Sequence, residues 1–186
     1  MSATPWTIHF IGACALALST AAVADGFTLD SPDIAEGQRI AVQHVFKGFG
    51  CDGGNVSPAL VWRNPPAGTQ GYAVTAYDPD APTGSGWWHW VVVNLPAQAT
   101  GLPAGAGNAQ GAMPAGARQI GTDYGMPGYG GPCPPQGHGE HRYIFTVYAL
   151  KTPQLALPEH ATAAMAGYMM RANSLGSASL TATYSR

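Results

Sequence analysis

Apolar residues recur along the chain in short runs separated by turn-forming residues, a pattern typical of a protein built mainly from β-strands. Residues 87–94 are apolar at nearly every position, which predicts a central strand covered on both faces. Residues 142–150 are rich in β-branched and aromatic side chains, which strands favour. We expect strands at residues 27–29, 39–46, 60–62, 72–77, 87–94, 142–150 and 180–184.

One segment has the composition of a helix, residues 161–175, which is rich in Ala, Met and Leu. Pro158 and Glu159 suit the first turn of a helix, and Gly176 is typical of a helix end. The pattern as a whole therefore predicts a mainly β fold with one late helix near the C-terminus.

The beginning of the chain resembles a secretory leader. An apolar stretch at residues 10–18 is followed by Ala22-Val-Ala24, an A-x-A cleavage pattern. We expect a signal peptide over residues 1–24 and a single domain over residues 25–186, because this length suits one core. Cleavage would place the protein in the periplasm or outside the cell.

The three cysteines raise two separate questions. Cys14 lies in Ile11-Gly-Ala-Cys14, so acylation of this residue in a lipoprotein is an alternative to simple cleavage of the leader. Cys51 and Cys133 are a candidate disulfide in an oxidising compartment. Closing a loop of about 80 residues would stabilise the fold by about 4.5 kcal/mol. Two buried, inert thiols are the other interpretation, since sequence does not show whether the pair lie close.

Charge and motifs exclude several functions. The net charge of −2 leaves no basic surface for nucleic acid. No apolar run reaches the roughly 18–20 residues that a membrane-spanning helix needs. The stretch from Gly48 to Gly53 matches G-x-G-x-x-G, but a dinucleotide site needs a helix to begin there. Asn55 and Pro58 interrupt the chain at that point, so we do not expect a nucleotide.

The best candidates for chemistry begin with Asp78-Pro-Asp-Ala-Pro82, which directly follows an expected strand. Loops held on a rigid scaffold commonly carry binding groups. Asp78 lies nearest the strand end and is expected to face a pocket. Asp80 is a weaker candidate, because its carboxylate has the alternative role of capping backbone amides in the turn.

His89 lies between Trp88 and Trp90 in an expected central strand. Strand alternation predicts that its side chain points away from both tryptophans. A buried histidine needs a partner, and we expect Asp78 to hold its tautomer and to raise its pKa.

A second polar group, His138-Gly-Glu-His141-Arg-Tyr143, precedes the expected strand at 142–150. His141 and Tyr143 should point to the same side, because side chains in a strand alternate. Cys133 with the two histidines suggests zinc, but a His-x-x-His spacing beside Pro-Cys-Pro-Pro does not match the common zinc motifs. We therefore expect no metal.

A nucleophilic role for Cys133 is also disfavoured. Pro134 follows it directly and lacks the backbone amide that an oxyanion hole could have used. We assign no catalytic residue and expect no cofactor.

Together, two histidines, a carboxylate, a tyrosine hydroxyl and a Gly-rich loop predict a small anion pocket. Histidine and backbone N–H groups donate to an anion, and nearby tryptophans exclude water, which strengthens each hydrogen bond. A carboxylate is unfavourable beside a phosphate unless it orients a histidine or contacts an ammonium group. A phosphoethanolamine-like group, which carries both charges, would suit this set of residues.

Several of these motifs resemble the phosphatidylethanolamine-binding protein family, in particular its bacterial YbhB/YbcL, or Raf-kinase-inhibitor-like, branch. They are Asp78-Pro-Asp-Ala-Pro82, Trp88-His-Trp90, Gly131-Pro-Cys-Pro-Pro-x-Gly137 with His141-Arg-Tyr143, Cys51-Asp-Gly-x-Asn55-x-Ser57-Pro58, and the glycines at 128–131. The resemblance extends from about residue 27 to the C-terminus.

The resemblance implies a β-sandwich-like core of antiparallel strands with a few short peripheral helices, and a pocket for phosphate-like anions and phospholipid headgroups. By resemblance the ligand-binding residues are Asp78, Asp80, His89, the backbone around Pro132, Cys133 and Pro134, His141 and Tyr143.

We therefore expect a secreted binder of a small anion or phospholipid headgroup, in which charged His89 and His141 donate to the ligand. One alternative is an inhibitor or modulator of a periplasmic protease or signalling enzyme, acting through the same pocket. Another is a phosphoester hydrolase that uses a histidine as general acid or base.

Overall fold

A computed structural model describes residue 1 and residues 26–186 of the chain. The predicted signal peptide over residues 1–24 and the alternative at Cys14 lie outside these described residues. In the described part, no helix is both long and apolar enough to cross a membrane.

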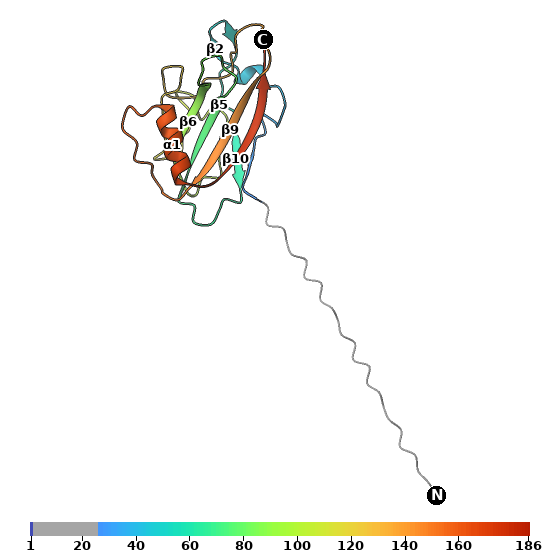
Figure 1. The fold of residues 1–186 in the computed structure, drawn as a ribbon, viewed down its shortest axis with the longest axis vertical. Coiled ribbons are helices and arrows are strands. Elements are labelled where there is room, and N and C mark those ends of the chain that lie inside the picture. The colour runs from blue at the N-terminus through green and yellow to red at the C-terminus, as the bar shows by residue number, and fades with distance from the viewer. Residues whose placement is uncertain (2–25) are drawn as a thin grey trace.

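The fold is organised around one five-stranded antiparallel sheet with the order β10-β9-β5-β6-β8 (Figure 1). β5 and β6 are buried on both faces, which the sequence predicted for residues 87–94. The strands of this sheet are β5 (Gly71–Asp78), β6 (Trp87–Pro96), β8 (Arg118–Gln119), β9 (His141–Leu150) and β10 (Ser174–Tyr184).

Two smaller sheets complete the β structure. A three-stranded sheet has the order β1-β4-β7, and β2 pairs with β3 in a hairpin. Their strands are β1 (Thr28–Asp30), β4 (Leu60–Arg63), β7 (Gly101–Leu102), β2 (Lys47–Gly48) and β3 (Cys51–Asp52). The hairpin was not predicted, because its segment is a Gly-rich stretch without apolar alternation.

The large sheet separates two apolar cores. Val74 and Val92 point toward the three-stranded sheet and pack with Trp62. Ala73 and Val91, their neighbours in sequence, point to the other face and pack against the helix. This arrangement of antiparallel layers with one late helix confirms the predicted fold class.

The helix α1 (Ala163–Asn173) begins later than expected. Its N-cap is Thr162, whose hydroxyl accepts a hydrogen bond from the amide of Met165 at 3.1 Å. The roles assigned to Pro158 and Glu159 are therefore wrong. Gly176 lies beyond the helix, in the irregular start of β10.

The strand predicted at residues 39–46 is also wrong in its middle. A short 3-10 turn, Val42–His44, replaces it. The amide of Ile40 donates to Thr183 and that of Phe46 donates to Pro132. Between them the carbonyls at 42, 43 and 45 accept from amides of residues 54–56, while the amides of residues 44 and 45 donate locally to the carbonyls of residues 41 and 42, so the middle forms a turn and no ladder.

Candidate functional site

A cavity of about 190 Å³ lies where three strands of the large sheet meet. Because β5 is antiparallel to both neighbours, its last residue, Asp78, lies beside the first residues of β6 and β9. The volume is below the roughly 300 Å³ at which pockets for drug-sized ligands begin, so it suits a small group. The lining residues are Phe49, Asp78, Ala81, Pro82, Thr83, Trp87, His89, Tyr124, Cys133, Pro134, Pro135, His141 and Tyr143.

Asp78 holds His141 rather than His89. Its Oδ2 accepts a hydrogen bond from Nδ1 of His141 at 2.7 Å, and its Oδ1 accepts from the amide of Asp80 at 2.7 Å. Asp78 and His141 are both buried. The expected Asp78–His89 hydrogen bond is not formed, because Nδ1 of His89 donates to the carbonyl of Gly130 instead. Of the two roles predicted for this carboxylate, the geometry favours orienting a histidine.

The second nitrogen of His141 is occupied as well. Its Nε2 lies 2.7 Å from Nδ1 of His138, an exposed residue on the turn before β9. A chain of hydrogen bonds therefore runs from buried Asp78 through His141 to the surface. A ligand that uses Nε2 of His141 must first displace the His138 side chain.

His89 is oriented by an irregularity in β6. Ala76 pairs with Trp90 but Tyr77 pairs with Trp88, so His89 is the extra residue of a β-bulge. Its ring packs edge-on against Tyr143, with ring centroids 5.1 Å apart. The bulge thus turns His89 to the pocket side of the sheet, where Trp90 also packs. The expectation that it points away from both tryptophans is wrong.

Nδ1 of His89 donates to the carbonyl of Gly130 at 2.7 Å. A carbonyl only accepts, so this bond fixes the tautomer and leaves Nε2 as the acceptor nitrogen of the neutral ring. Complete burial lowers the pKa of His89, against the opposing effect of the nearby Gly130 carbonyl and Asp78. The expected rise in this pKa is therefore wrong, and the ring is neutral near pH 7.

Two buried donors on the pocket wall lack a partner. Among the described residues, neither Nε1 of Trp87 nor the hydroxyl of Tyr143 has a hydrogen bond. Burial also raises the pKa of Tyr143, so its hydroxyl keeps its proton. Buried polar groups are normally satisfied, and an orphaned pair in one cavity indicates an acceptor that is supplied from outside.

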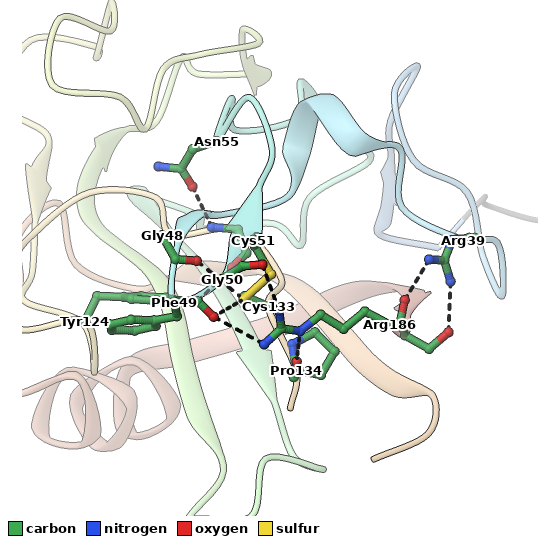
Figure 2. Close-up of a disulfide and its surroundings, with 12 residues drawn as sticks. Arg39, Gly48, Phe49, Gly50, Cys51, Asn55, Tyr124, Cys133, Pro134 and Arg186 are labelled. Atoms are coloured by element: carbon green, nitrogen blue, oxygen red, sulfur yellow. Dashed lines mark hydrogen bonds between the residues drawn. A yellow bond between two sulfur atoms is a disulfide. The ribbon is translucent and has the colours of Figure 1, made fainter. Parts of the chain in front are cut away.

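The wall formed by residues 131–134 is held by side chains from distant segments. Oδ1 of Asn55 accepts from the amide of Gly131 at 2.8 Å. Cys133 forms a disulfide with Cys51, across 82 residues of sequence and with the Cα atoms 6.0 Å apart (Figure 2). Of the two interpretations of this pair, the structure shows the bridge. A bridged Cys133 has no thiol to act as a nucleophile.

Arg186 ties the same wall to the β2–β3 hairpin. Its Nε donates to the carbonyl of Pro134 at 2.6 Å, and its terminal nitrogens donate to the carbonyls of Gly50 and Phe49 at 2.9 and 3.2 Å (Figure 2). The hairpin and the pocket wall therefore form one braced unit.

Two of the eight residues predicted for the site do not line the cavity. Asp80 turns outward and binds Arg142 with both oxygens, at 2.9 and 2.7 Å. The Arg142 guanidinium lowers the pKa of the Asp80 carboxyl to about 2. Pro132 belongs to the 131–134 wall but does not line the cavity, and its carbonyl accepts from the amide of Phe46.

Seven lining residues were not among those predicted for the site: Phe49, Ala81, Pro82, Thr83, Trp87, Tyr124 and Pro135. His138, which bonds to His141, was considered only as a zinc ligand. Their side chains reach the pocket only through the tertiary fold. The one local signal was the position of Trp87 at the start of a strand and next to a turn, which could have indicated a residue at the pocket. Within residues 26–186, no group of three or more His, Cys, Asp or Glu side chains could hold a metal.

Comparison with known proteins identifies the family to which the chain and its fold belong. Residues 30–185 match the family model of the phosphatidylethanolamine-binding protein. The chain belongs to this family, as the resemblance of its motifs predicted.

Similar bacterial proteins cover nearly the whole chain. Protein YbcL of Escherichia coli K12 is 48% identical over 168 residues, which is 90% of this chain and 92% of YbcL. Protein YbhB of the same organism is 53% identical over 157 residues, 84% of this chain and 99% of YbhB. The crystal structure of E. coli YbcL superposes with a TM-score of 0.84, covering 87% of this chain and 99% of YbcL.

Proposed function

We propose that the protein binds a small phosphate-bearing ligand, of the phosphoethanolamine type, in the pocket at the end of β5. The observation that carries the proposal is the pair of unpartnered buried donors, Trp87 Nε1 and the Tyr143 hydroxyl. Phosphate oxygens are strong acceptors, and donors in a site shielded from water bind them more strongly than donors in bulk solvent.

The pocket also offers an acceptor, which narrows the ligand class. Neutral His89 presents Nε2, for which no hydrogen bond is found among residues 26–186, while its Nδ1–H is used by Gly130. A ligand that carries a donor beside its phosphate fits this set. The ammonium of an ethanolamine group meets the requirement, and so does the P–O–H of a phosphate monoester below its second pKa of about 6.

A matched pair of ligands tests this arrangement. Phosphoethanolamine and phosphocholine carry the same charges, but the quaternary ammonium of phosphocholine has no N–H to donate. In calorimetric titrations at pH 8, we expect phosphoethanolamine to bind on the order of tenfold more tightly, the value of one good hydrogen bond. Trp87→Phe, which removes one donor and keeps an aromatic ring, should weaken both ligands. Equal affinities in the wild type would contradict the acceptor role of His89.

We also propose that the protein is periplasmic or secreted, on the basis of the predicted signal peptide and the disulfide. A bridge such as Cys51–Cys133 persists in oxidising compartments, in agreement with export of the mature chain to the periplasm or beyond.

A further inference from the structure

Phe49 has a backbone conformation that disfavours its own side chain. It forms the two-residue turn between β2 and β3 with Gly50, and both have positive φ angles, 53° and 81°. Such turns favour Asn-Gly, because asparagine tolerates the left-handed region and a bulky ring does not. The geometry of the turn therefore does not explain why position 49 is a phenylalanine.

The rest of the chain follows the expected preference. Residues 26–186 contain four non-glycine positions with positive φ, and the other three are Asn55, Asn64 and Asn94. Phe49 is the exception among them. Strained conformations that persist in a fold are concentrated at functional sites, so the exception calls for a reason outside the local structure.

Burial in the core does not supply that reason. The Phe49 side chain is 69% exposed. One face of the ring lies against Tyr124, with centroids 5.8 Å apart and planes inclined by 18° (Figure 2). Phe49 also lines the pocket. The hairpin therefore presents an apolar ring to solvent at the edge of the cavity.

The backbone that carries the ring is held in place. The disulfide holds the hairpin at Cys51, and Arg186 donates to the carbonyls of Phe49 and Gly50 (Figure 2). Because the backbone is braced, contact with a ligand would cost little conformational freedom.

We propose that Phe49 is a specificity-determining residue: it selects phosphate esters with an apolar substituent over bare phosphate. The inference rests on the proposed function, in which the phosphate lies against Trp87 and Tyr143. A substituent leaving the small cavity passes the Phe49 ring, and burying its methylenes there adds roughly fourfold in affinity for each.

The test compares butyl phosphate with inorganic phosphate at pH 6, in the wild type and in Phe49→Asn. The wild type should prefer butyl phosphate by on the order of tenfold, the effect of burying between one and two methylenes. Phe49→Asn should lose most of that preference, through a larger fall in affinity for butyl phosphate than for inorganic phosphate. Because asparagine suits the turn, the Tm of the variant should be unchanged or higher by up to about 4 °C. A loss of preference without a loss of Tm separates selection from a structural role.

Two further variants serve as controls. Phe49→Leu keeps an apolar side chain and should keep most of the preference. Tyr168→Asn removes another exposed aromatic residue, 72% exposed, from α1 on the opposite side of the large sheet. This change should leave the affinity for both ligands unchanged.

Several results would overturn the inference: a preference that persists in Phe49→Asn, an equal loss for both ligands, or a fall in Tm of more than about 4 °C. Wild-type protein that binds both ligands equally would refute this inference alone. Wild-type protein that binds neither would refute the proposed function and the inference with it. If the selectivity holds, a comparison of dihexanoyl phosphatidylethanolamine with glycerophosphoethanolamine identifies the source of the substituent. Tighter binding of dihexanoyl phosphatidylethanolamine indicates a lipid ligand, and equal binding indicates a small soluble ester.

Discussion

The two histidine walls of the pocket show how differently one residue type is used. On the β6 side, His89 donates Nδ1–H to a backbone carbonyl, has its pKa lowered by burial and keeps Nε2 unpaired in the described structure. On the β9 side, His141 is held by a carboxylate at one nitrogen and by exposed His138 at the other. On the β6 side, Nε2 of His89 is therefore available to a ligand. On the β9 side, a ligand must first replace His138 as the partner of His141.

The largest effect should come from breaking the support of the β9 wall. Asp78→Ala removes the acceptor of His141 and of the Asp80 amide in a buried site, which should destabilise the fold by about 3 kcal/mol. The matched change, Asp80→Ala, removes a partly exposed ion pair and should cost about 1 kcal/mol or less. Urea unfolding of both variants measures the difference. Similar values would contradict the special role of Asp78.

His89, on the β6 side, should make the free energy of unfolding depend on pH. Unfolded His89 takes up a proton near its ordinary pKa of 6.5, while burial keeps the folded ring neutral to lower pH. Its contribution to stability is therefore complete above pH 6.5 and is lost on acidification below it, by at most about 1.4 kcal/mol per pH unit. His89→Asn retains a donor for Gly130 and should remove this part of the slope in unfolding experiments at pH 5–7. An unchanged slope would show that His89 is not the group responsible.

The same variant tests binding at constant pH. His89→Asn keeps the Gly130 bond but removes the acceptor that faces the ligand. At pH 7 we expect affinity for phosphoethanolamine to fall on the order of tenfold, with little change in the free energy of unfolding. Calorimetry and urea unfolding provide the two measurements. Unaltered affinity would exclude His89 from the set of binding groups.

The smallest effect should have the opposite sign. His138→Ala frees Nε2 of His141, so a ligand no longer has to break the hydrogen bond between the two rings. Affinity for phosphoethanolamine should rise by about two- to tenfold. In His138→Asn the amide can replace the Nδ1 donor, so its affinity should stay near the wild-type value. A fall in affinity in His138→Ala would instead make His138 a direct contact of the ligand.

The comparison also shows what the sequence could predict. Continuous apolar runs predicted the central strands, and the motifs predicted which polar residues gather at their ends. His89 faces the pocket because of a bulge in β6, and local sequence carries no sign of that extra residue. The pairing of Asp78 with His141 instead of His89 was not visible in the sequence either. His138 reaches His141 through the turn before β9. Which nitrogens remain free thus depends on tertiary geometry.

The most direct test of the central claim is an NMR titration that follows the indole N–H signals of the tryptophans. Nε1 of Trp62 and of Trp90 already donate, to the carbonyl of Ala99 and to Gln119, whereas Nε1 of Trp87 has no partner in the described residues. Saturating phosphoethanolamine should shift the Trp87 signal, identified by its absence in Trp87→Phe, and leave those of Trp62 and Trp90 in place. A Trp87 signal that does not move, in folded protein at millimolar ligand, would contradict phosphate binding in this pocket.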